Sequence, residues 1–304
     1  MKLKESISNQ IPDWRERITE LVQKDPDRIV GEVTLRQIYG GMRGVRCLVT
    51  EISSVDPEEG IRLRGYTIPE LLDKLPKKAG NDIPLVGGLY YLLLTGNLPN
   101  LEEAEEVESE WKTRSEIPSQ VYRVLDGMPV DAHPMTLFSQ AILALQNESV
   151  FNRAYNEGIN KRDYWEATLE DSLNLTAKVT SIAALIYNLK QARMEEIQTD
   201  PSQDWAGNFA KSMGKENTGY DELSRLYFII HSDHESGNVS AHATHLVGSA
   251  LSDVYLATSA GMNGLSGPLH GRANQESLAW LSRIYDQFGG VPSKPQLTDF
   301  AWET

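Results

Sequence analysis

Residues 231–276 have the sequence HSDHESGNVSAHATHLVGSALSDVYLATSAGMNGLSGPLHGRANQE, and the pattern of this stretch decides the fold class. Its apolar residues recur at the spacing of one helical face: Val239, Ala243, Leu246, Ala250 and Val254. Gly237 interrupts the helical pattern before this run, and glycines between 261 and 271 interrupt it before an amphipathic run that begins at Ala273. The stretch therefore predicts helices joined by glycine-containing loops.

Most of the remaining chain shows the same helical periodicity. Helices are predicted over these ranges: 12–24, 85–95, 134–145, 165–190 and 221–230. Residues 47–55 (CLVTEISSV) and 60–66 (GIRLRGY) flank the turn sequence DPEE and predict a hairpin of two short strands. The polar segment 192–219 is expected to be a connecting loop. We therefore predict an all-α, multi-helical fold with one small β-hairpin near the N-terminus.

The composition is that of an ordinary globular protein, with 24% charged and 40% hydrophobic residues in a chain of 304. The net charge of −14 argues against a nucleic acid or an anionic membrane as the main partner. It leaves a small anionic ligand open, because a few arginines and helix N-termini can hold one locally. A small-molecule partner is therefore favoured.

The sequence also predicts the compartment. Cys47 is the only cysteine, so no intrachain disulfide forms and a reducing compartment is expected. Residues 1–21 lack the apolar core of a signal peptide and contain acidic residues that a transit peptide avoids. No apolar stretch approaches the length of a membrane span. We expect a cytoplasmic protein, or a mitochondrial matrix protein if the source is eukaryotic.

Five of the six histidines lie between positions 231 and 270. Two pairs have i, i+3 spacing: His231 with His234, and His242 with His245. A zinc site would need a third ligand in fixed geometry, and neither an HExxH motif nor a cysteine pair accompanies them. No metal site is therefore predicted, and His231, His242 and His245 are interpreted as structural residues.

His234 and His270 differ from these because both lie in segments that break the helical pattern. Asn238 or Ser240 can cap the helix that follows His234, which leaves N–H groups free to meet a small carboxylate. His270 precedes the N-terminal end of a helix, whose dipole disfavours imidazolium. A neutral histidine there can donate a hydrogen bond to a carbonyl that gains negative charge. The pattern fits enolate chemistry beside a bound anion, and equally a pair of surface histidines.

Residues 231–276 resemble the signature region of citrate synthases of the mitochondrial and related bacterial type. The resemblance extends to IYGGMRGVRCLV, DPEEGIRLRGYTIPE, DAHPMTLFSQAI and FNRAYNEGINKRDYWE, and so covers nearly the whole chain. It implies an all-α homodimer that condenses acetyl-CoA with oxaloacetate in the tricarboxylic acid cycle, through citryl-CoA, without a further cofactor. Residues 1–270 then match most of a large domain, and residues 271–304 match the beginning of a small one.

The resemblance also implies roles for single residues. His270 matches the catalytic histidine that hydrogen-bonds the thioester carbonyl and stabilises the acetyl-CoA enol, and Ser240 matches the residue that orients this histidine. His234 matches an oxaloacetate-binding histidine, with Asn238 beside it. These four residues are the candidate catalytic and substrate-binding site.

Two basic residues are implied as CoA contacts. Arg43 matches an arginine near the CoA phosphates, and Lys161 stands where the family often has an arginine. Lysine keeps that charge and loses the fork geometry of the guanidinium. The run 245–264 is rich in small residues and is expected to form one helix that packs closely, either within the subunit or against its twin in a homodimer.

The sequence stops within a helical pattern that starts at Leu297, and the resemblance implies that further chain follows. That part would supply a second catalytic histidine, an aspartate base and most oxaloacetate-binding arginines. No histidine follows His270 and no arginine follows Arg283, so the 304-residue chain is expected to be inactive alone. Two other interpretations stay open: a shortened, inactive paralogue that acts by protein–protein interaction, and a 2-methylcitrate synthase that uses propionyl-CoA.

Overall fold

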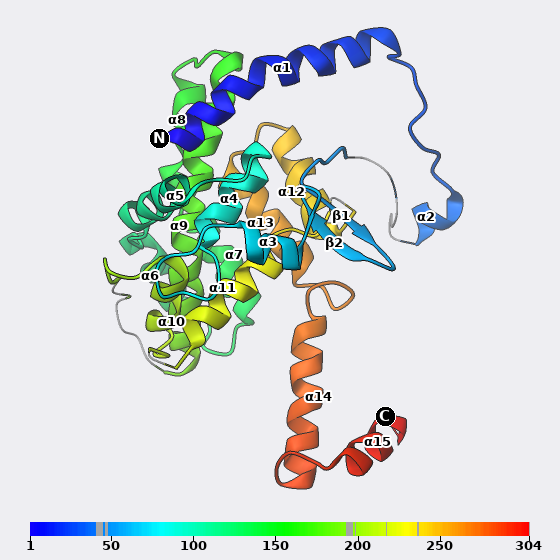
Figure 1. Ribbon diagram of the computed structural model, residues 1–304, viewed down its shortest axis with the longest axis vertical. Helices are drawn as coiled ribbons and strands as arrows, with labels where there is room; N and C mark the ends of the chain where they lie inside the picture. The colour runs from blue at the N-terminus through cyan, green and yellow to red at the C-terminus, as the bar shows by residue number, and fades with distance from the viewer. Residues whose placement is uncertain are drawn as a thin grey trace.

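The computed structural model describes residues 1–40, 45, 48–192, 197, 199–216, 218–235 and 237–303. Within these ranges the fold is almost all α with one small sheet, as predicted (Figure 1). The helices before residue 150 are α1 Lys2–Lys24, α2 Leu35–Tyr39, α3 Ile68–Lys74, α4 Val86–Thr95, α5 Leu101–Arg114, α6 Ser119–Asp126 and α7 Pro134–Ala144. The later ones are α8 Val150–Asn156, α9 Tyr164–Lys190, α10 Trp205–Ser212, α11 Tyr220–Ile230, α12 Val239–Ser249, α13 Val254–Leu265, α14 Ala273–Phe288 and α15 Lys294–Glu303. Two short 3-10 helices are η1 Gln146–Glu148 and η2 Lys161–Asp163.

The predicted hairpin is confirmed. The strands of the sheet are β1 Ser53–Asp56, β2 Gly60–Leu63 and β3 Tyr66–Thr67, all antiparallel and in the order β1-β2-β3. Oδ1 of Asp56 accepts hydrogen bonds from the N–H groups of Glu58 and Glu59 at 2.8 and 2.9 Å, which closes the DPEE turn. The third strand is an addition to the two that the sequence predicts.

Two predicted helix boundaries are confirmed by residues that favour them. Helix α4 ends at Gly96, which takes the left-handed conformation with φ of 75° that glycine adopts without strain. Pro134 occupies the first turn of α7, where its missing N–H has no intrahelical partner to lose.

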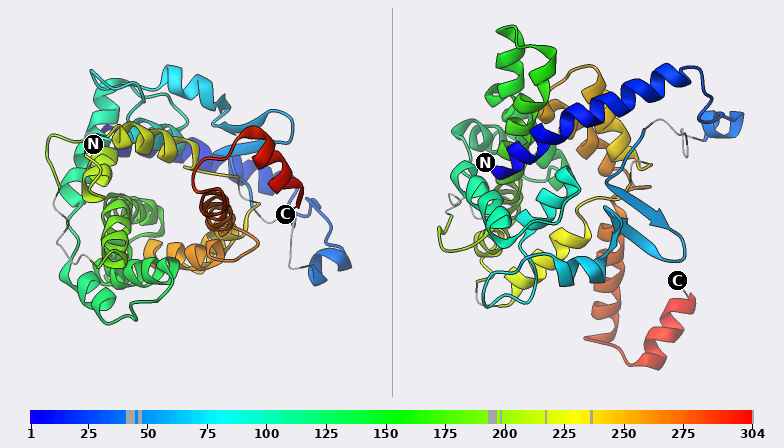
Figure 2. Two further views of the ribbon diagram at one scale, coloured as in Figure 1. Left: turned by 90° about the horizontal axis from the view of Figure 1, so that it is seen from below. Right: turned by 45° about the horizontal axis from the view of Figure 1, so that its top comes forward.

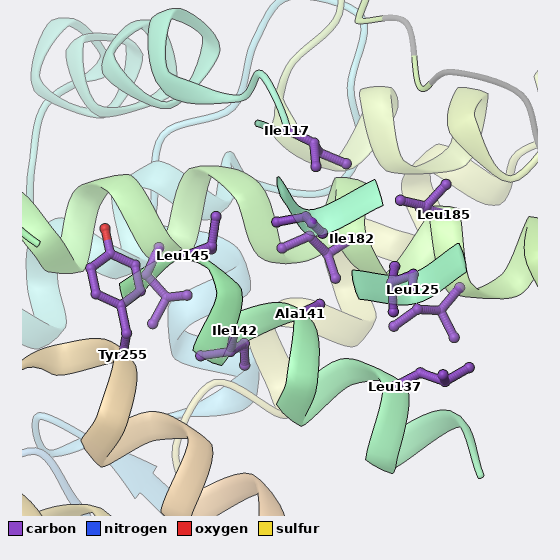
Figure 3. Packing of buried hydrophobic residues seen from close by; sticks show 12 residues of the cluster. Ile117, Leu125, Leu137, Ala141, Ile142, Leu145, Ile182, Leu185 and Tyr255 are labelled. Atoms are coloured by element: carbon purple, nitrogen blue, oxygen red, sulfur yellow. The ribbon is translucent and has the colours of Figure 1, made fainter. Parts of the chain in front are cut away.

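The long helix α9 lies at the centre of the body and contributes to two hydrophobic clusters. On one side its Ile182 and Leu185 pack with Leu137 and Ile142 of α7 and with Tyr255 of α13 (Figure 3). On the other side it packs with α4, α5 and α10. None of the helices in the described ranges is both long and apolar enough to span a membrane.

A buried polar network joins α4, α5, α10 and α11. The two carboxylate oxygens of Glu108 accept hydrogen bonds from the backbone N–H groups of Gly87 and Trp205, both at 2.8 Å. Nearby, Arg225 of α11 donates from Nε to Asp204 at 2.8 Å, and both of these side chains are buried. Burial, and secondarily the charge of Asp204, raises the pKa of Glu108 to about 7.

Helices at both ends of the chain extend away from the body. Helix α1 crosses one end, and α14 with α15 leaves at the opposite end (Figures 1 and 2). Of α14, only Ile284 is buried, and Gln275 contacts the body through a 3.1 Å hydrogen bond with His133. The chain exposes 18500 Å², whereas a compact protein of 34.0 kDa exposes roughly 13,000 Å². The described chain therefore has much surface that could pack against further protein.

Three predicted elements need correction. The first helix begins at Lys2 rather than at residue 12, since Pro12 lies within its length without ending it. The segment 192–219 contains helix α10, capped by Asp204, whose side chain accepts from Gly207 N–H. The run 245–264 forms parts of two helices, because the chain turns at Leu251 (φ 61°) and Asp253 caps α13.

The raised pKa of Glu108 predicts a pH-dependent stability. Its pKa is about 7 in the folded chain against an ordinary value of 4.5, so the folded state binds the extra proton between these values. The free energy of unfolding should therefore fall by about 3 kcal/mol as pH rises from about 4.5 to about 7, and then level off. Urea unfolding at a series of pH values measures this.

The variant Glu108→Gln cannot ionise and should lose this part of the pH dependence. The matched control Glu105→Gln, at an exposed position of the same helix, should keep the wild-type slope. Equal slopes for wild type and Glu108→Gln would contradict the assignment.

Candidate functional site

The candidate site is built on two antiparallel helices, α12 and α13, that pack unusually closely. A Cβ added at Gly261 would lie 2.1 Å from Thr244 Oγ1 and 2.9 Å from the carbonyl oxygen of Ser240. One added at Gly264 would lie 3.2 Å from Cγ1 of Val239. The small residues of this region therefore serve contact between two helices of one chain, and they bring the end of α13 to the beginning of α12.

Asn238 caps α12 and also ties down the loop before it. Its Oδ1 accepts from Ala241 N–H at 2.9 Å and from the Ser240 hydroxyl at 2.6 Å. Its Nδ2 donates to the carbonyl oxygens of His234 and Glu235, both at 2.9 Å. The carboxamide thus has a partner for each hydrogen and each lone pair. The prediction that Asn238 or Ser240 caps this helix is confirmed for Asn238.

Ser240 links this cap to His270. Its Oγ lies 2.9 Å from Nε2 of His270, although the two residues are 30 positions apart. His270 is half-buried, and its position is set by a tight loop in which its own N–H donates to Gly267 and the N–H of Gly271 donates to Leu265, both at 3.0 Å. We call His270, Ser240 and Asn238 the His270 cluster. With Nε2 occupied by Ser240, Nδ1 is the ring nitrogen left for a ligand.

His234 lies on the loop that Asn238 holds, and its side chain is exposed. The same loop is fastened to the sheet by Ser53 of β1. The Ser53 hydroxyl donates to Asp233 Oδ2 at 2.5 Å and accepts from the N–H of Glu235 at 2.6 Å. Backbone and side-chain hydrogen bonds therefore connect the segments of His234 and His270. Sequence reasoning missed Ser53, because nothing in a short strand indicates a partner 180 residues away.

The remaining histidines of the stretch make other contacts. His231 stacks on Tyr227 at a ring-centroid distance of 4.0 Å, and its Nδ1 lies 3.0 Å from the carbonyl oxygen of the same residue. His242 and His245 lie on α12, the first half-buried and the second exposed. Among the described residues, no group of three or more histidine, cysteine, aspartate or glutamate side chains is arranged to hold a metal ion.

The two residues expected to contact CoA are Arg43 and Lys161. Arg43 is outside the described residues. Lys161 is exposed at the start of η2, near the place where Arg15 of α1 donates to the carbonyl oxygen of Arg162 at 2.7 Å. Within the part of the chain that the structure describes, no hydrogen bond or ion pair joins Lys161 to the His270 cluster.

A largely apolar cavity of about 1030 Å³ lies next to the cluster. Its lining includes Tyr90 and Trp205 in the body, and Gly271 and Arg272 directly after His270. Neither His234 nor His270 lines it. The cavity is therefore a neighbour of the His270 cluster, and neither of the two candidate histidines opens into it.

Comparisons of this chain with a family model, with known proteins and with solved structures all point to the same family. A sequence model of the citrate synthase C-terminal domain matches residues 41–304. The chain is 49% identical over 303 residues to mitochondrial citrate synthase of Xiphias gladius, covering 99% of this chain and 65% of that protein. This chain therefore spans less than two thirds of the length of that relative.

Solved structures of citrate synthases share the fold. That from Pyrobaculum aerophilum superimposes with a TM-score of 0.68 at 28% identity, covering 82% of this chain and 61% of that one. The Thermoplasma acidophilum citrate synthase, solved as a ternary complex with carboxymethyl coenzyme A and oxaloacetate, has a TM-score of 0.67 at 21% identity and covers 81% of this chain and 60% of that one.

The close approach at Gly261 predicts a stability effect. Gly261→Ala should destabilise the chain by roughly 1–3 kcal/mol, because the added methyl group meets Thr244 and the backbone of Ser240. Gly248→Ala is the matched control on α12, where the nearest atom to an added Cβ lies 4.0 Å away. The control should be neutral or gain about 0.5 kcal/mol, since alanine favours a helix. Urea unfolding followed by circular dichroism compares the two, and an unchanged midpoint for Gly261→Ala would contradict the packing argument.

Proposed function

Because the chain belongs to the citrate synthase family, we propose that it is the greater part of a citrate synthase that condenses acetyl-CoA with oxaloacetate to citrate and CoA in the tricarboxylic acid cycle. The observation that carries the proposal is the 2.9 Å contact between Ser240 and His270, since this is the pair that the family resemblance implies. The ligands of the Thermoplasma acidophilum structure, a CoA derivative and oxaloacetate, support the same substrate pair.

In the proposed reaction His270 hydrogen-bonds the thioester carbonyl of acetyl-CoA. A base then takes a methyl proton, which gives an enolate, and a positioned N–H stabilises the negative charge that develops on its oxygen. Ser240 holds the ring in place through Nε2. His234, exposed on the adjoining loop, contacts oxaloacetate, and Asn238 takes part only by exchanging one of its existing hydrogen bonds. The remaining acid and base groups are proposed to come from residues outside this chain's 304.

Binding of the CoA phosphates is assigned to Arg43 and Lys161. Both carry positive charge in a chain with a net charge of −14, and phosphate contacts in proteins rely on such local cations. Lys161 is exposed at the start of η2, so its ammonium group is accessible to a phosphate.

We also propose that residues 1–270 form most of one domain and that residues 271–304 begin another. The departure of α14 and α15 from the body supports this boundary (Figure 1). The comparisons give no support to the inactive-paralogue or 2-methylcitrate interpretations, because the similar proteins are named as citrate synthases. The name of the Xiphias gladius relative favours mitochondria over the cytoplasm as the location.

The proposal is tested by activity. The 304-residue chain should release no CoA from acetyl-CoA and oxaloacetate above background, because His270 is the only one of the expected acid–base groups that it contains. A chimera that joins residues 1–304 to the part of the Xiphias gladius enzyme beyond its match to this chain should be active with acetyl-CoA. His270→Ala in that chimera should reduce kcat roughly 10³-fold or more, since such groups act as a unit.

Three outcomes of these activity measurements would contradict the proposal or favour its alternative. CoA release by the 304-residue chain that His270→Ala abolishes would contradict the expected inactivity. A chimera that is folded by circular dichroism but inactive would contradict the proposed function. Preference for propionyl-CoA over acetyl-CoA would favour the 2-methylcitrate alternative.

We further propose that the chain forms a homodimer through α12. This helix has no fully buried residue, and Leu246 at its exposed side is 64% accessible. An apolar face of this kind is typical of a protein–protein contact.

Light scattering at micromolar concentration should give a dimer or a larger species. Leu246→Lys should lower the mean mass, because a charge in an apolar contact is costly. Leu223→Lys, at an exposed leucine of α11, is the control and should leave the mass unchanged. A monodisperse species near 34.0 kDa for the unmodified chain would contradict the proposal.

A further inference from the structure

The Ser240 hydroxyl stands between two polar atoms and has a single proton to give. Its oxygen lies 2.6 Å from Oδ1 of Asn238 and 2.9 Å from Nε2 of His270. Two oxygens at 2.6 Å repel each other unless a proton lies between them. Which partner receives the proton therefore depends on whether the amide oxygen or the amide nitrogen of Asn238 faces Ser240.

The orientation of the Asn238 amide is fixed by its other partners. The nitrogen end faces two carbonyl oxygens, those of His234 and Glu235, and neither can donate. The oxygen end faces the N–H of Ala241, which can only donate. Turning the amide over would lose all three hydrogen bonds. The atom that faces Ser240 is therefore an oxygen without a proton, and Ser240 must donate to it.

This leaves Ser240 as an acceptor toward His270. Nε2 of His270 must carry a proton to make the 2.9 Å contact. In a neutral imidazole the other nitrogen, Nδ1, then has a lone pair and no proton. The role proposed for His270 needs the opposite arrangement, because the nitrogen that meets the thioester carbonyl must donate.

We propose that Asn238 is a positioning residue that, through Ser240, holds His270 as the Nε2–H tautomer until a change at Asn238 releases the serine hydroxyl. On release, Ser240 turns about its Cβ–Oγ bond and donates to Nε2. The ring loses the Nε2 proton to water and gains one from water at Nδ1, so the imidazole stays neutral. The consequence for catalysis rests on the proposed function, whereas the proton assignment rests on the hydrogen bonds alone.

The Asn238 carboxamide is suited to this role because each of its hydrogens and each lone pair of its oxygen already has a hydrogen-bond partner. Any group that binds Asn238, such as a carboxylate accepting from Nδ2 or a donor approaching Oδ1, must displace one of the four hydrogen bonds. Displacement of the Ser240 hydroxyl by a ligand donor gives the Nδ1–H tautomer directly. Occupation of the neighbouring ligand site is in this way coupled to the proton of His270.

The tautomer is measured by NMR of the 304-residue chain labelled with ¹⁵N in its imidazole rings. Long-range ¹H–¹⁵N correlations at pH 8 distinguish a protonated ring nitrogen from an unprotonated one, and His270→Gln identifies the His270 signals by their loss. The unmodified chain should show Nε2–H in roughly fivefold excess or more, the ratio that one ordinary hydrogen bond supports. A predominant Nδ1–H form, or an imidazolium, would overturn the proposal.

The deciding variant is Asn238→Ser. Serine still caps a helix but is too short to engage Ser240 in the same way, so the Nδ1–H form should rise severalfold. The control Asn100→Ser makes the same change at the N-cap of α5, where Asn100 accepts from Glu103 N–H, and should leave His270 unchanged.

A His270 spectrum that is the same in Asn238→Ser as in the unmodified chain, with the helical content retained, would overturn the proposal. If Asn238→Ser unfolds, the tautomer of the unmodified chain still decides it. The spectra do not depend on turnover. An inactive chimera with the expected tautomers would therefore refute the proposed function alone, and an active chimera with the wrong tautomers would refute the positioning role alone.

Discussion

The contact between α12 and α13 is the constraint on which the candidate site depends. At Gly261 there is no room for a side chain beside Thr244 and the backbone of Ser240, so the two helices lie as close as their backbones allow. Gly264 continues this contact to the first residues of α12. The chain therefore leaves α13 beside Ser240, and a short loop returns His270 to it. A wider helix pair would separate the hydroxyl from the imidazole.

Helix α11 and the loop of His234, which precede α12, are held in place by a buried ion pair and by Ser53. Arg225 anchors α11 through Asp204, and both side chains are buried, so loss of Arg225 would leave the Asp204 carboxylate without its buried cation. Helix α11 leads directly into the loop of His234, and Ser53 fastens that loop to the sheet. The position of His234 thus depends on the ion pair that anchors α11 just before it and on the contact with Ser53 in the distant strand β1. Rigid support of this kind is what a ligand-binding loop needs.

Local signals predicted the fold well where one residue controls a boundary. The DPEE turn, Gly96 and Pro134 each act through their own backbone preferences, and each prediction is confirmed. The break between α12 and α13 was missed because the apolar spacing of Ala250 and Val254 continues across it. Asp253, which caps α13, was the available signal.

The site was less accessible to such reasoning. Asn238 was predicted as a cap from its type and place, but its two bonds to carbonyl oxygens depend on the loop shape, in which Glu235 takes a positive φ of 43°. The pairing of Ser240 with His270 follows from the family resemblance, because no periodicity relates positions 30 residues apart. Long-range geometry is set by packing, and a single sequence does not display it.

The types of side chain in the His270 cluster indicate which role the cluster has: it orients groups by hydrogen bonds and does not supply positive charge. Among the described residues, the hydrogen bonds of the His270 cluster come from a carboxamide, a hydroxyl, an imidazole and backbone amides, and not from a lysine, arginine or carboxylate side chain. Hydrogen-bond donors of this kind can orient an anionic substrate. In a chain with a net charge of −14 they do not offset the electrostatic cost of bringing oxaloacetate and acetyl-CoA, the two anionic substrates of the proposed function, together. One cation close by is Arg272, two residues after His270 in the lining of the neighbouring cavity, and the proposed function adds Arg43 and Lys161. In the proposed function, the His270 cluster therefore sets the geometry and the position of one proton, and positively charged groups outside the cluster offset the charge of the substrates.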